Sequence, residues 1–289
     1  MALPTTSEFI KKHNLDAKKS LGQNFILDKN FTDKIARSAI SQGRSDLSDE
    51  IILEIGPGPA SLTRSILDLN PKKLIVIEKD PRCIEILQEI QEFYGSDKLE
   101  IHNKDAIKID ELAILNLQKD QKFKIIANLP YNIGTLLLIK WLKIAKNIDS
   151  MTLMLQKEVA QRISSKANDQ HYGRIAILTQ NFAYAKILFD VNKSIFTPPP
   201  KVTSAIIQIT PFSKPLFDVE LQKLEKTTFA AFSQRRKMIR ASLKNLEFKD
   251  GKSLEEVLGK LNIEPTLRAE NLSLQNFCDI ALSLEASAH

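Results

Sequence analysis

The chain has 289 residues, of which 43% are hydrophobic and 26% are charged, so a largely disordered protein is excluded and one or two globular domains are expected. The 41 Lys and Arg residues exceed the 35 Asp and Glu residues by six, which permits a nucleic-acid partner without requiring one. The sequence has no apolar run of about 18 residues and no apolar segment near its start, so we expect neither a membrane span nor a signal peptide.

Residues 1–30 form a polar, basic arm that ends in a Gly-Gln-Asn-Phe segment. One interpretation is a solvated arm that leads into a short turn. The other is a lid over a binding site, because Gly22 allows close backbone approach and Gln23 and Asn24 supply amide groups. Phe25 would add an aromatic face to such a lid.

A glycine turn follows the first predicted strand. The apolar run Ile51–Ile55 predicts a short buried strand, and Gly56 and Gly58 come directly after it. Glycines two positions apart suit a tight turn against which the backbone of a ligand can press. The pattern continues with Ala60 rather than with a third glycine, so this turn alone is weak evidence for a nucleotide site.

The next two predicted strands each deliver a carboxylate. Glu78 follows the apolar run Leu74–Ile77 and lies twenty positions after Gly58, where a doubly wound fold places the acid that binds ribose hydroxyls. A surface charge is the alternative interpretation of Glu78. Asp105 follows the predicted strand Leu99–His102, and its carboxylate could accept a hydrogen bond from the adenine amino group of a cofactor.

The apolar run Phe123–Ala127 predicts a buried strand that ends in the tetrapeptide Asn-Leu-Pro-Tyr. The amino group of adenine is a poor nucleophile, because its lone pair is delocalised into the ring. The side chain of Asn128 and a backbone carbonyl beside Pro130 could accept both N6 hydrogens and direct the lone pair at an electrophile. Pro130 restricts Leu129, and Tyr131 offers a face for a flipped-out base. The alternative is an ordinary strand exit with a core tyrosine.

These strands predict an α/β fold. Because the carboxyl ends of parallel strands meet at one edge of a sheet, we expect Gly56, Glu78, Asp105 and Asn128 to lie together there. Strands and helices alternate over most of the chain, and only helical patterns follow. We therefore predict a Rossmann-like domain with a mostly parallel sheet over residues 1–211, which includes the arm, and a small all-α domain over residues 212–289.

The segment Ser194–Ser204 contains three consecutive prolines, which predict a rigid, extended path without regular secondary structure. Such a path could hold Phe196 against the face of a base opposite Tyr131. A structural crossover with a core phenylalanine is the alternative.

The longest helical pattern in the last part of the chain covers Leu221–Leu246. A wheel at about 100° per residue puts Phe229 and Phe232 on its apolar face. Cations along the flank of this helix form a row that could bind the phosphates of a nucleic acid, here called a phosphate rail. Such flanks are usually only solvated. Arg236 falls inside the apolar stripe, which indicates a kink, an internal partner or an error in the helix. The candidate RNA-binding residues are Lys201, Arg235, Arg236, Lys237, Arg240 and Lys244.

The sequence has no His or Cys cluster with metal-ligand spacing, so we expect no metal. Cys83 and Cys278 are far apart and favour reduced thiols in the cytoplasm. His13, His102 and His171 are isolated, and we expect each to be structural.

Several segments spread over nearly the whole chain carry a resemblance: Gly22–Phe25, Leu53–Gly58, Glu78, Asp105–Ala106, Asn128–Ile133, Pro198–Ser204 and Arg235–Lys237. Together they resemble the small-subunit ribosomal RNA adenine N6,N6-dimethyltransferase family. The resemblance implies S-adenosylmethionine as the methyl donor and two adjacent adenosines in the 3′-terminal hairpin loop of 16S rRNA as the substrate. It also implies that the enzyme acts on immature 30S particles during ribosome biogenesis.

The resemblance also implies roles for individual residues. The implied reaction is direct methyl transfer to N6. The residues expected to bind the target base are Asn128, Leu129, Pro130, Tyr131 and Phe196. The donor site is expected to contain Gln23, Asn24, Ile26, Gly56, Gly58, Glu78, Lys79, Asp105, Ala106 and Asn128. Ala60 stands where the family usually has a third glycine, and we expect donor binding to survive because alanine still permits close helix approach.

Two other functions stay open. A large-subunit rRNA adenine methyltransferase of the macrolide-resistance type shares the donor site and the tetrapeptide, but the Pro-Pro-Pro-Lys-Val segment and the helical tail favour the small subunit. A mainly non-catalytic ribosome-assembly or RNA-binding factor is the other alternative, and the intact series of Glu78, Asp105, Asn128 and Tyr131 weighs against it. The sequence carries no oligomer signal, so we expect a monomer.

Overall fold

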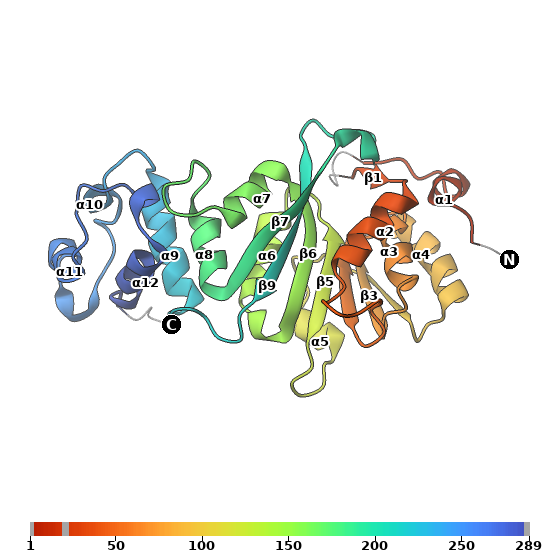
Figure 1. The fold of residues 1–289 in the computed structure, drawn as a ribbon, viewed down its shortest axis with the longest axis horizontal. Coiled ribbons are helices and arrows are strands. Elements are labelled where there is room, and N and C mark those ends of the chain that lie inside the picture. Colours follow the sequence, from red (N-terminus) through yellow and green to blue (C-terminus); the bar gives the residue numbers. More distant parts are fainter. Residues whose placement is uncertain (1–2, 19–22, 286–289) are drawn as a thin grey trace. The chain divides into compact units, whose positions relative to one another are not determined.

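The computed structural model of the protein describes residues 3–18 and 23–285 (Figure 1). The chain forms two compact units. Unit 1 comprises Met1–Ala160 and Lys186–Pro211, and unit 2 comprises Gln161–Ala185 and Phe212–His289.

The break after Pro211 coincides with the predicted limit between residues 1–211 and 212–289. Residues 161–185 differ from the expectation, because they group with the C-terminal helices. Within unit 2, the ring of Tyr172 meets that of Phe232 edge-on, with 6.3 Å between centroids. Periodicity along the sequence does not reveal such a long-range contact. The limits of two independently folding domains stay a prediction.

Unit 1 is organised around a seven-stranded sheet with the strand order β4-β3-β2-β5-β6-β9-β7. The pairs from β4 through β6 are parallel, whereas β9 is antiparallel to β6. This topology confirms the predicted mostly parallel α/β fold. The strands are β2 (Ile51–Ile55), β3 (Lys73–Glu78), β4 (Leu99–Asn103), β5 (Phe123–Asn128), β6 (Ile148–Gln156), β7 (Ala183–Val191) and β9 (Ser204–Pro211).

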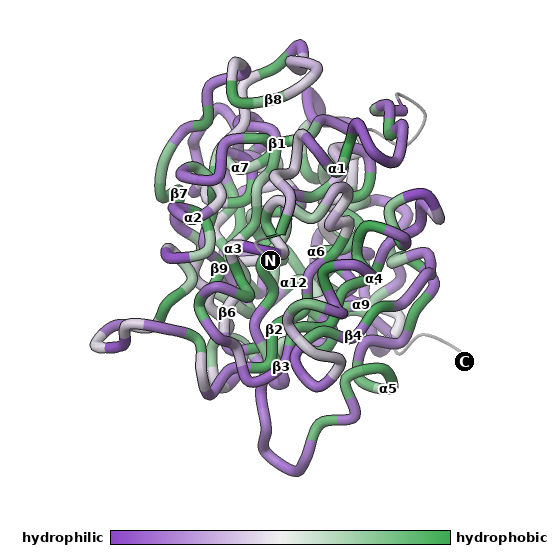
Figure 2. Tube along the Cα trace, turned by 90° about the vertical axis from the view of Figure 1, so that its right-hand side faces the viewer, coloured by the Kyte–Doolittle hydropathy of each residue, from purple (hydrophilic) through white to green (hydrophobic). Residues whose placement is uncertain are grey.

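The central strands are mostly apolar, with Glu54 of β2 and Lys124 of β5 as buried charged exceptions, as expected for parallel strands that are buried on both faces. All residues of β2 are buried. Ile52 and Val76 on the sheet belong to one hydrophobic cluster with Ile35 of α2 and Ile66 of α3, so these helices cover one face. Figure 2 shows the contrast: the chain around β2 and β3 is largely hydrophobic, and the loops that project from it are hydrophilic.

Several helices from α1 to α7 begin where the sequence supplies caps; α1 to α6 lie in unit 1, and α7 begins in unit 1 and ends in unit 2. Asp80 accepts a hydrogen bond from the backbone N–H of Arg82 at the start of α4, and Pro81 occupies the first turn. Thr5 and Glu8 form a capping box at α1, which the sequence analysis missed although this pair is a readable signal. The helices are α1 (Thr6–Lys12), α2 (Lys29–Ser38), α3 (Ser61–Leu67), α4 (Pro81–Tyr94), α5 (Glu111–Leu115), α6 (Gly134–Leu142) and α7 (Lys157–Ser164), with short 3-10 turns at Ala145–Asn147 and Lys193–Ile195.

A small two-stranded sheet ties the N-terminal arm to the Pro-rich segment. Phe25–Ile26 (β1) pairs antiparallel with Phe196–Thr197 (β8). The expectation that Ser194–Ser204 has no regular structure was therefore wrong. A partner strand that lies far away in the sequence stabilises β8, and no local pattern indicates it.

The single helix predicted over Leu221–Leu246 is also wrong. The first helix ends at Ser233, because Gln234 leaves the helical region with φ −128° and ψ 61°. Arg236 lies in the exposed turn that follows, so its place in the apolar stripe came from an error in the predicted helix, which was one of the three alternatives. The helices of unit 2 are α8 (Arg174–Phe182), α9 (Leu221–Ser233), α10 (Ile239–Ser242), α11 (Leu254–Lys260) and α12 (Leu274–Leu282), with 3-10 turns at Lys249–Gly251 and Ala269–Asn271.

The two aromatic residues of α9 that were expected on one apolar face also lie in different surroundings. Phe232 stacks on Phe277, with 5.8 Å between ring centroids. Phe229 was placed on the same apolar face, but it is 60% exposed and lies under the guanidinium of Arg174 at 5.0 Å. The true core face is therefore rotated from the one that a continuous helix predicts.

Within residues 3–18 and 23–285, no helix is both long and apolar enough to cross a membrane. The same residues contain no group of three or more His, Cys, Asp or Glu side chains that could hold a metal ion. Cys83 and Cys278 are buried free thiols.

Candidate active site

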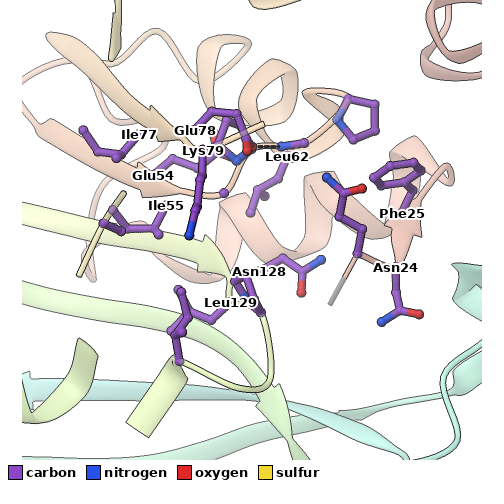
Figure 3. A pocket seen from close by; sticks show the side chains of 18 of the residues that line it. Asn24, Phe25, Glu54, Ile55, Leu62, Ile77, Glu78, Lys79, Asn128 and Leu129 are labelled. Atoms are coloured by element: carbon purple, nitrogen blue, oxygen red, sulfur yellow. Dashed lines mark hydrogen bonds between the residues drawn. The ribbon is translucent and has the colours of Figure 1, made fainter. Parts of the chain in front are cut away.

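A pocket opens where the strand order of the sheet reverses (Figure 3). The chain runs outward from β2 to β3 and β4, then returns to place β5 on the other side of β2, and open α/β sheets bind ligands at such a point. Every residue predicted to contact the donor or the target base lines this pocket: Gln23, Asn24, Ile26, Gly56, Gly58, Glu78, Lys79, Asp105, Ala106, Asn128, Leu129, Pro130, Tyr131 and Phe196. Gly22 of the predicted lid lies outside the described residues.

The glycine turn after β2 adopts conformations that disfavour side chains. Gly56 and Gly58 have φ values of 66° and 55°, and Ala60 has a φ of 64°. A left-handed conformation costs a residue with a Cβ roughly 1–2 kcal/mol. Ala60 is fully buried at the start of α3, so the turn keeps its shape at a cost that glycine would avoid.

Glu78 ends β3 with its side chain almost fully buried. Its Oε2 accepts a hydrogen bond from the backbone N–H of Gly58 at 3.0 Å, and its Oε1 accepts one from the backbone N–H of Asp80 at 2.7 Å. Burial raises the pKa of Glu78, and these two hydrogen bonds oppose the rise. Each carboxylate oxygen retains a second lone pair, so Glu78 can also accept hydrogen bonds from ligand hydroxyls.

Asp105 lies beyond the end of β4 and forms an ion pair with Lys79, with 2.9 Å between Oδ2 and Nζ. Its Oδ1 accepts a hydrogen bond from the backbone N–H of Ile107 at 3.0 Å. The hydrogen bond from Lys79 lowers the pKa of Asp105, so the carboxylate is an ionised acceptor at the pocket edge. Ala106, the next residue, is buried.

Asn128 is the last residue of β5 and is half-buried in the pocket. Among the residues that the structure describes, none forms a hydrogen bond with its side-chain amide. The carbonyl of Pro130 accepts from the backbone N–H of Ile133 at 3.1 Å, whereas no described backbone N–H donates to the carbonyl of Leu129. Two acceptors of the tetrapeptide, both on residues that line the pocket, therefore lack a hydrogen-bond donor among the described residues.

Tyr131 and Phe196 border the same pocket in different ways. The hydroxyl of Tyr131 lies 2.6 Å from Oγ of Ser204, at the start of β9, and burial raises the pKa of Tyr131. Phe196 is only 3% exposed and belongs to the hydrophobic cluster that includes Phe25. Phe196 is therefore a core residue that also lines the pocket, and its contact with a target base stays a prediction.

The candidate RNA-binding cations do not share one helix. Arg235 forms an ion pair with Glu270 at 3.0 Å and donates a hydrogen bond to the carbonyl of Gln170 at 2.8 Å, all within unit 2. A rail along a single helix is therefore wrong, because the chain turns between α9 and α10. All six cations are nevertheless exposed: Lys201, Arg235, Arg236, Lys237, Arg240 and Lys244.

The sequence analysis missed three residues around the pocket. Glu54 lines it and is 1% exposed, and burial raises the pKa of Glu54 to about 8. A charge inside the apolar run of β2 was the available signal. Ser204 contacts Tyr131 and Asp80 contacts Gln23, and because the partners lie far apart in the chain, no local sequence pattern indicates either contact.

The fold and the pocket together define the class of protein to which this chain belongs. An open, mostly parallel sheet that carries a glycine turn and a strand-end acid on neighbouring strands is the arrangement of Rossmann-like, S-adenosylmethionine-dependent methyltransferases. The chain superimposes on a dimethyladenosine transferase from Plasmodium falciparum with a TM-score of 0.71, at 28% identity over 89% of this chain and 96% of that chain. It superimposes on the 23S rRNA methyltransferase ErmE with a TM-score of 0.63 and 23% identity, over 90% of this chain and 99% of that chain, which shows the shared fold.

Sequence relatives narrow the class. The family model described as "Ribosomal RNA adenine dimethylase" matches residues 14–286. The "Ribosomal RNA small subunit methyltransferase A" of Allorhizobium ampelinum is 48% identical over 96% of this chain and 97% of its own length. The protein of the same name from Paramagnetospirillum magneticum is 43% identical over 98% of this chain and 96% of its own length. The chain therefore belongs to the ribosomal RNA adenine dimethylase family.

Proposed function

We propose that the protein transfers methyl groups from S-adenosylmethionine to N6 of two adjacent adenosines in the 3′-terminal hairpin loop of small-subunit rRNA, and that it dimethylates each of them. Family membership supports the reaction and the rRNA substrate. One structural observation supports the placement of the donor and the target base in this pocket. The amide of Asn128, to which no described residue forms a hydrogen bond, and the buried acid Glu78 line the same pocket from neighbouring parts of one sheet edge.

The pocket residues fit the donor. Left-handed glycines at positions 56 and 58 let a ligand approach the turn without meeting a Cβ. The carboxylate of Glu78 would hold the ribose hydroxyls, and Asp105 would accept from the adenine amino group. When bound, S-adenosylmethionine supplies a methyl carbon that is electrophilic because it is attached to a sulfonium.

The tetrapeptide would prepare the target amine. The side-chain carbonyl of Asn128 and the backbone carbonyl of Leu129 are the two available acceptors, and together they can bind both N6 hydrogens. This pairing localises the nitrogen lone pair and points it away from the two acceptors. The ring of Tyr131, held at its hydroxyl by Ser204, would stack on the base.

We also propose that the enzyme acts in the cytoplasm as a monomer, on immature 30S particles. Exposed cations on both units support binding to the rRNA backbone, which acts through charge and is weakened by salt. Arg236 and Lys237 of the turn after α9 are the best candidates for phosphate contacts. Arg235 already binds Glu270, so it contributes less free charge.

The experiment is methylation of ribosomal particles with isotope-labelled donor. We expect mass to be gained by two adjacent adenosines of 16S rRNA in immature 30S particles. Label in the large-subunit rRNA would instead identify an enzyme of the macrolide-resistance type. Tight binding to the particle without any transfer of label would identify a non-catalytic assembly factor, and either result would reject the proposal.

A further inference from the structure

Asp80 lies two positions after Glu78 and is 3% exposed. Its Oδ2 accepts hydrogen bonds from Nε2 of Gln23 at 3.0 Å and from Nη2 of Arg82 at 2.6 Å, and its Oδ1 accepts one from Nε of Arg82 at 3.0 Å. The Arg82 guanidinium, with smaller help from Gln23, lowers the pKa of Asp80 to about 2. The carboxylate is therefore ionised at any physiological pH and binds two separate segments of the chain.

One of these segments is the N-terminal arm, which is fastened at further points. The backbone N–H of Lys18 donates to Oε1 of Gln23 at 2.9 Å, and Nη1 of Arg82 donates to the carbonyl of Asp16 at 3.2 Å. Both Oε1 and Nε2 of the Gln23 side chain therefore form hydrogen bonds within the protein. Although Gln23 lines the pocket, these contacts make it a residue that holds the arm in place.

Asp80 is also hydrogen-bonded to Glu78, the buried acid of the pocket. The backbone N–H of Asp80 donates to Oε1 of Glu78 at 2.7 Å, and Oε2 of Glu78 accepts from the backbone N–H of Gly58 at 3.0 Å. A shift of Asp80 would therefore turn the Glu78 carboxylate. The arm continues from Gln23 into Asn24 and Ile26, which line the same pocket.

We propose that Asp80 is a positioning residue that fastens Gln23 at the donor pocket and orients Glu78, so that the ordering of residues 23–26 and donor binding strengthen each other. The inference rests on the proposed function, because it takes S-adenosylmethionine as the ligand of the pocket. Coupling of this kind is reciprocal: if the fastened segment 23–26 tightens donor binding, the bound donor must stabilise that segment by the same factor.

The variant Asp80→Asn tests the coupling. Asparagine caps a helix as well as aspartate, so α4 keeps its start. One oxygen becomes an amino group that faces the donors of Gln23 or Arg82, and the charge is lost. We expect the Kd for S-adenosylmethionine to rise about tenfold, as for loss of a hydrogen bond to a charged group. We also expect faster amide exchange of residues 23–27 in the donor-free protein.

The matched control is Asp49→Asn, which removes an exposed ion pair with Arg44 of 2.7 Å far along the chain from the arm. It should change neither donor affinity nor exchange of the arm. If Asp80→Asn fails to fold, Arg82→Gln removes the main partner of Asp80 while leaving the cap. Unchanged donor affinity or unchanged arm exchange in whichever of the two variants folds would overturn the proposal.

A double-mutant cycle separates positioning from a general loss of stability. Gln23→Ala and Asp80→Asn break the same contact, so their effects on donor affinity should not add. Fully additive effects would contradict a common role. None of these measurements uses rRNA, so a failure to methylate 30S particles would reject the proposed function and leave the result on arm exchange intact.

Discussion

The two sides of the pocket are held by different kinds of interaction. Gly56, Glu78, Asp105 and Asn128 stand at or just beyond the ends of parallel strands, whose ladders fix them. The arm side depends on two residues of β1, their pairing with β8 and the hydrogen bonds of Asp80. The sheet side is therefore fixed by many ladder hydrogen bonds, whereas the placement of the arm side depends on a few contacts.

The largest expected effect is on the sheet side. Asn128→Ala should lower the rate of methyl transfer by roughly 100-fold or more, because one preorganised acceptor for the amine is lost. Donor affinity should change much less. Asn128→Asp keeps an acceptor oxygen in the same place and should retain more activity than the alanine variant. Single-turnover kinetics together with donor titrations would measure both quantities, and near-normal turnover of Asn128→Ala would refute the assigned role.

The buried carboxyl group of Glu54, on the sheet side, should make the stability of the protein depend on pH. Its pKa of about 8 lies above the ordinary value of 4.5, so the folded state keeps a proton that the unfolded state releases. The stability of the protein should therefore fall as pH rises from about 4.5 to about 8. Glu54→Gln should remove this loss, which is roughly 3 kcal/mol in favour of the variant at pH 8 relative to pH 5.

Denaturant unfolding of Glu54→Gln and wild type across this pH range is the measurement. Glu92→Gln changes an exposed carboxylate and serves as the control, with a pH profile parallel to that of the wild type. Parallel profiles for Glu54→Gln as well would mean that Glu54 is ionised in the folded protein.

A smaller effect is expected where the two sides meet. Glu78→Gln puts an amino group against the backbone N–H groups of Gly58 or Asp80 and removes the charge. We expect the Kd for the donor to rise about tenfold, as for loss of a hydrogen bond to a charged group. Calorimetric titration would measure it, with RNA affinity as the quantity that should stay constant. A variant that binds donor like the wild type would remove Glu78 from the site.

The smallest effect concerns the turn that joins β2 to α3. Ala60→Gly should relieve the left-handed strain at φ 64° and raise the free energy of unfolding by about 1 kcal/mol. Alanine at Gly43, which has a φ of 84° and open space around it, is the reverse control and should destabilise the protein by a similar amount. Chemical denaturation would test both, and a loss of stability in Ala60→Gly would show that the turn is not strained.

The same contrast explains how much could be read from the sequence. The strand-borne residues were predictable, because apolar runs that end in Gly56, Glu78 and Asn128 are local signals. The pairing of β1 with β8 and the bond between Tyr131 and Ser204 join positions far apart in the chain, so no local period encodes them.

Unit 2 shows a further limit of periodicity. The helical period from Leu221 onward was extended across Ser233, where the helix ends. Only the conflict at Arg236, a charge inside an apolar stripe, indicated the break. Tertiary packing decides such a boundary, which is why the cations were placed on one helix when they lie on a helix and in turns.

The most direct measurement is a crystal structure with S-adenosylhomocysteine, the demethylated donor. We predict the ribose against Glu78, the sulfur near the amide of Asn128 and Gln23 still bound to Asp80. A ligand bound away from the strand ends, or an Asn128 side chain that points away from the sulfur, would contradict the proposed site.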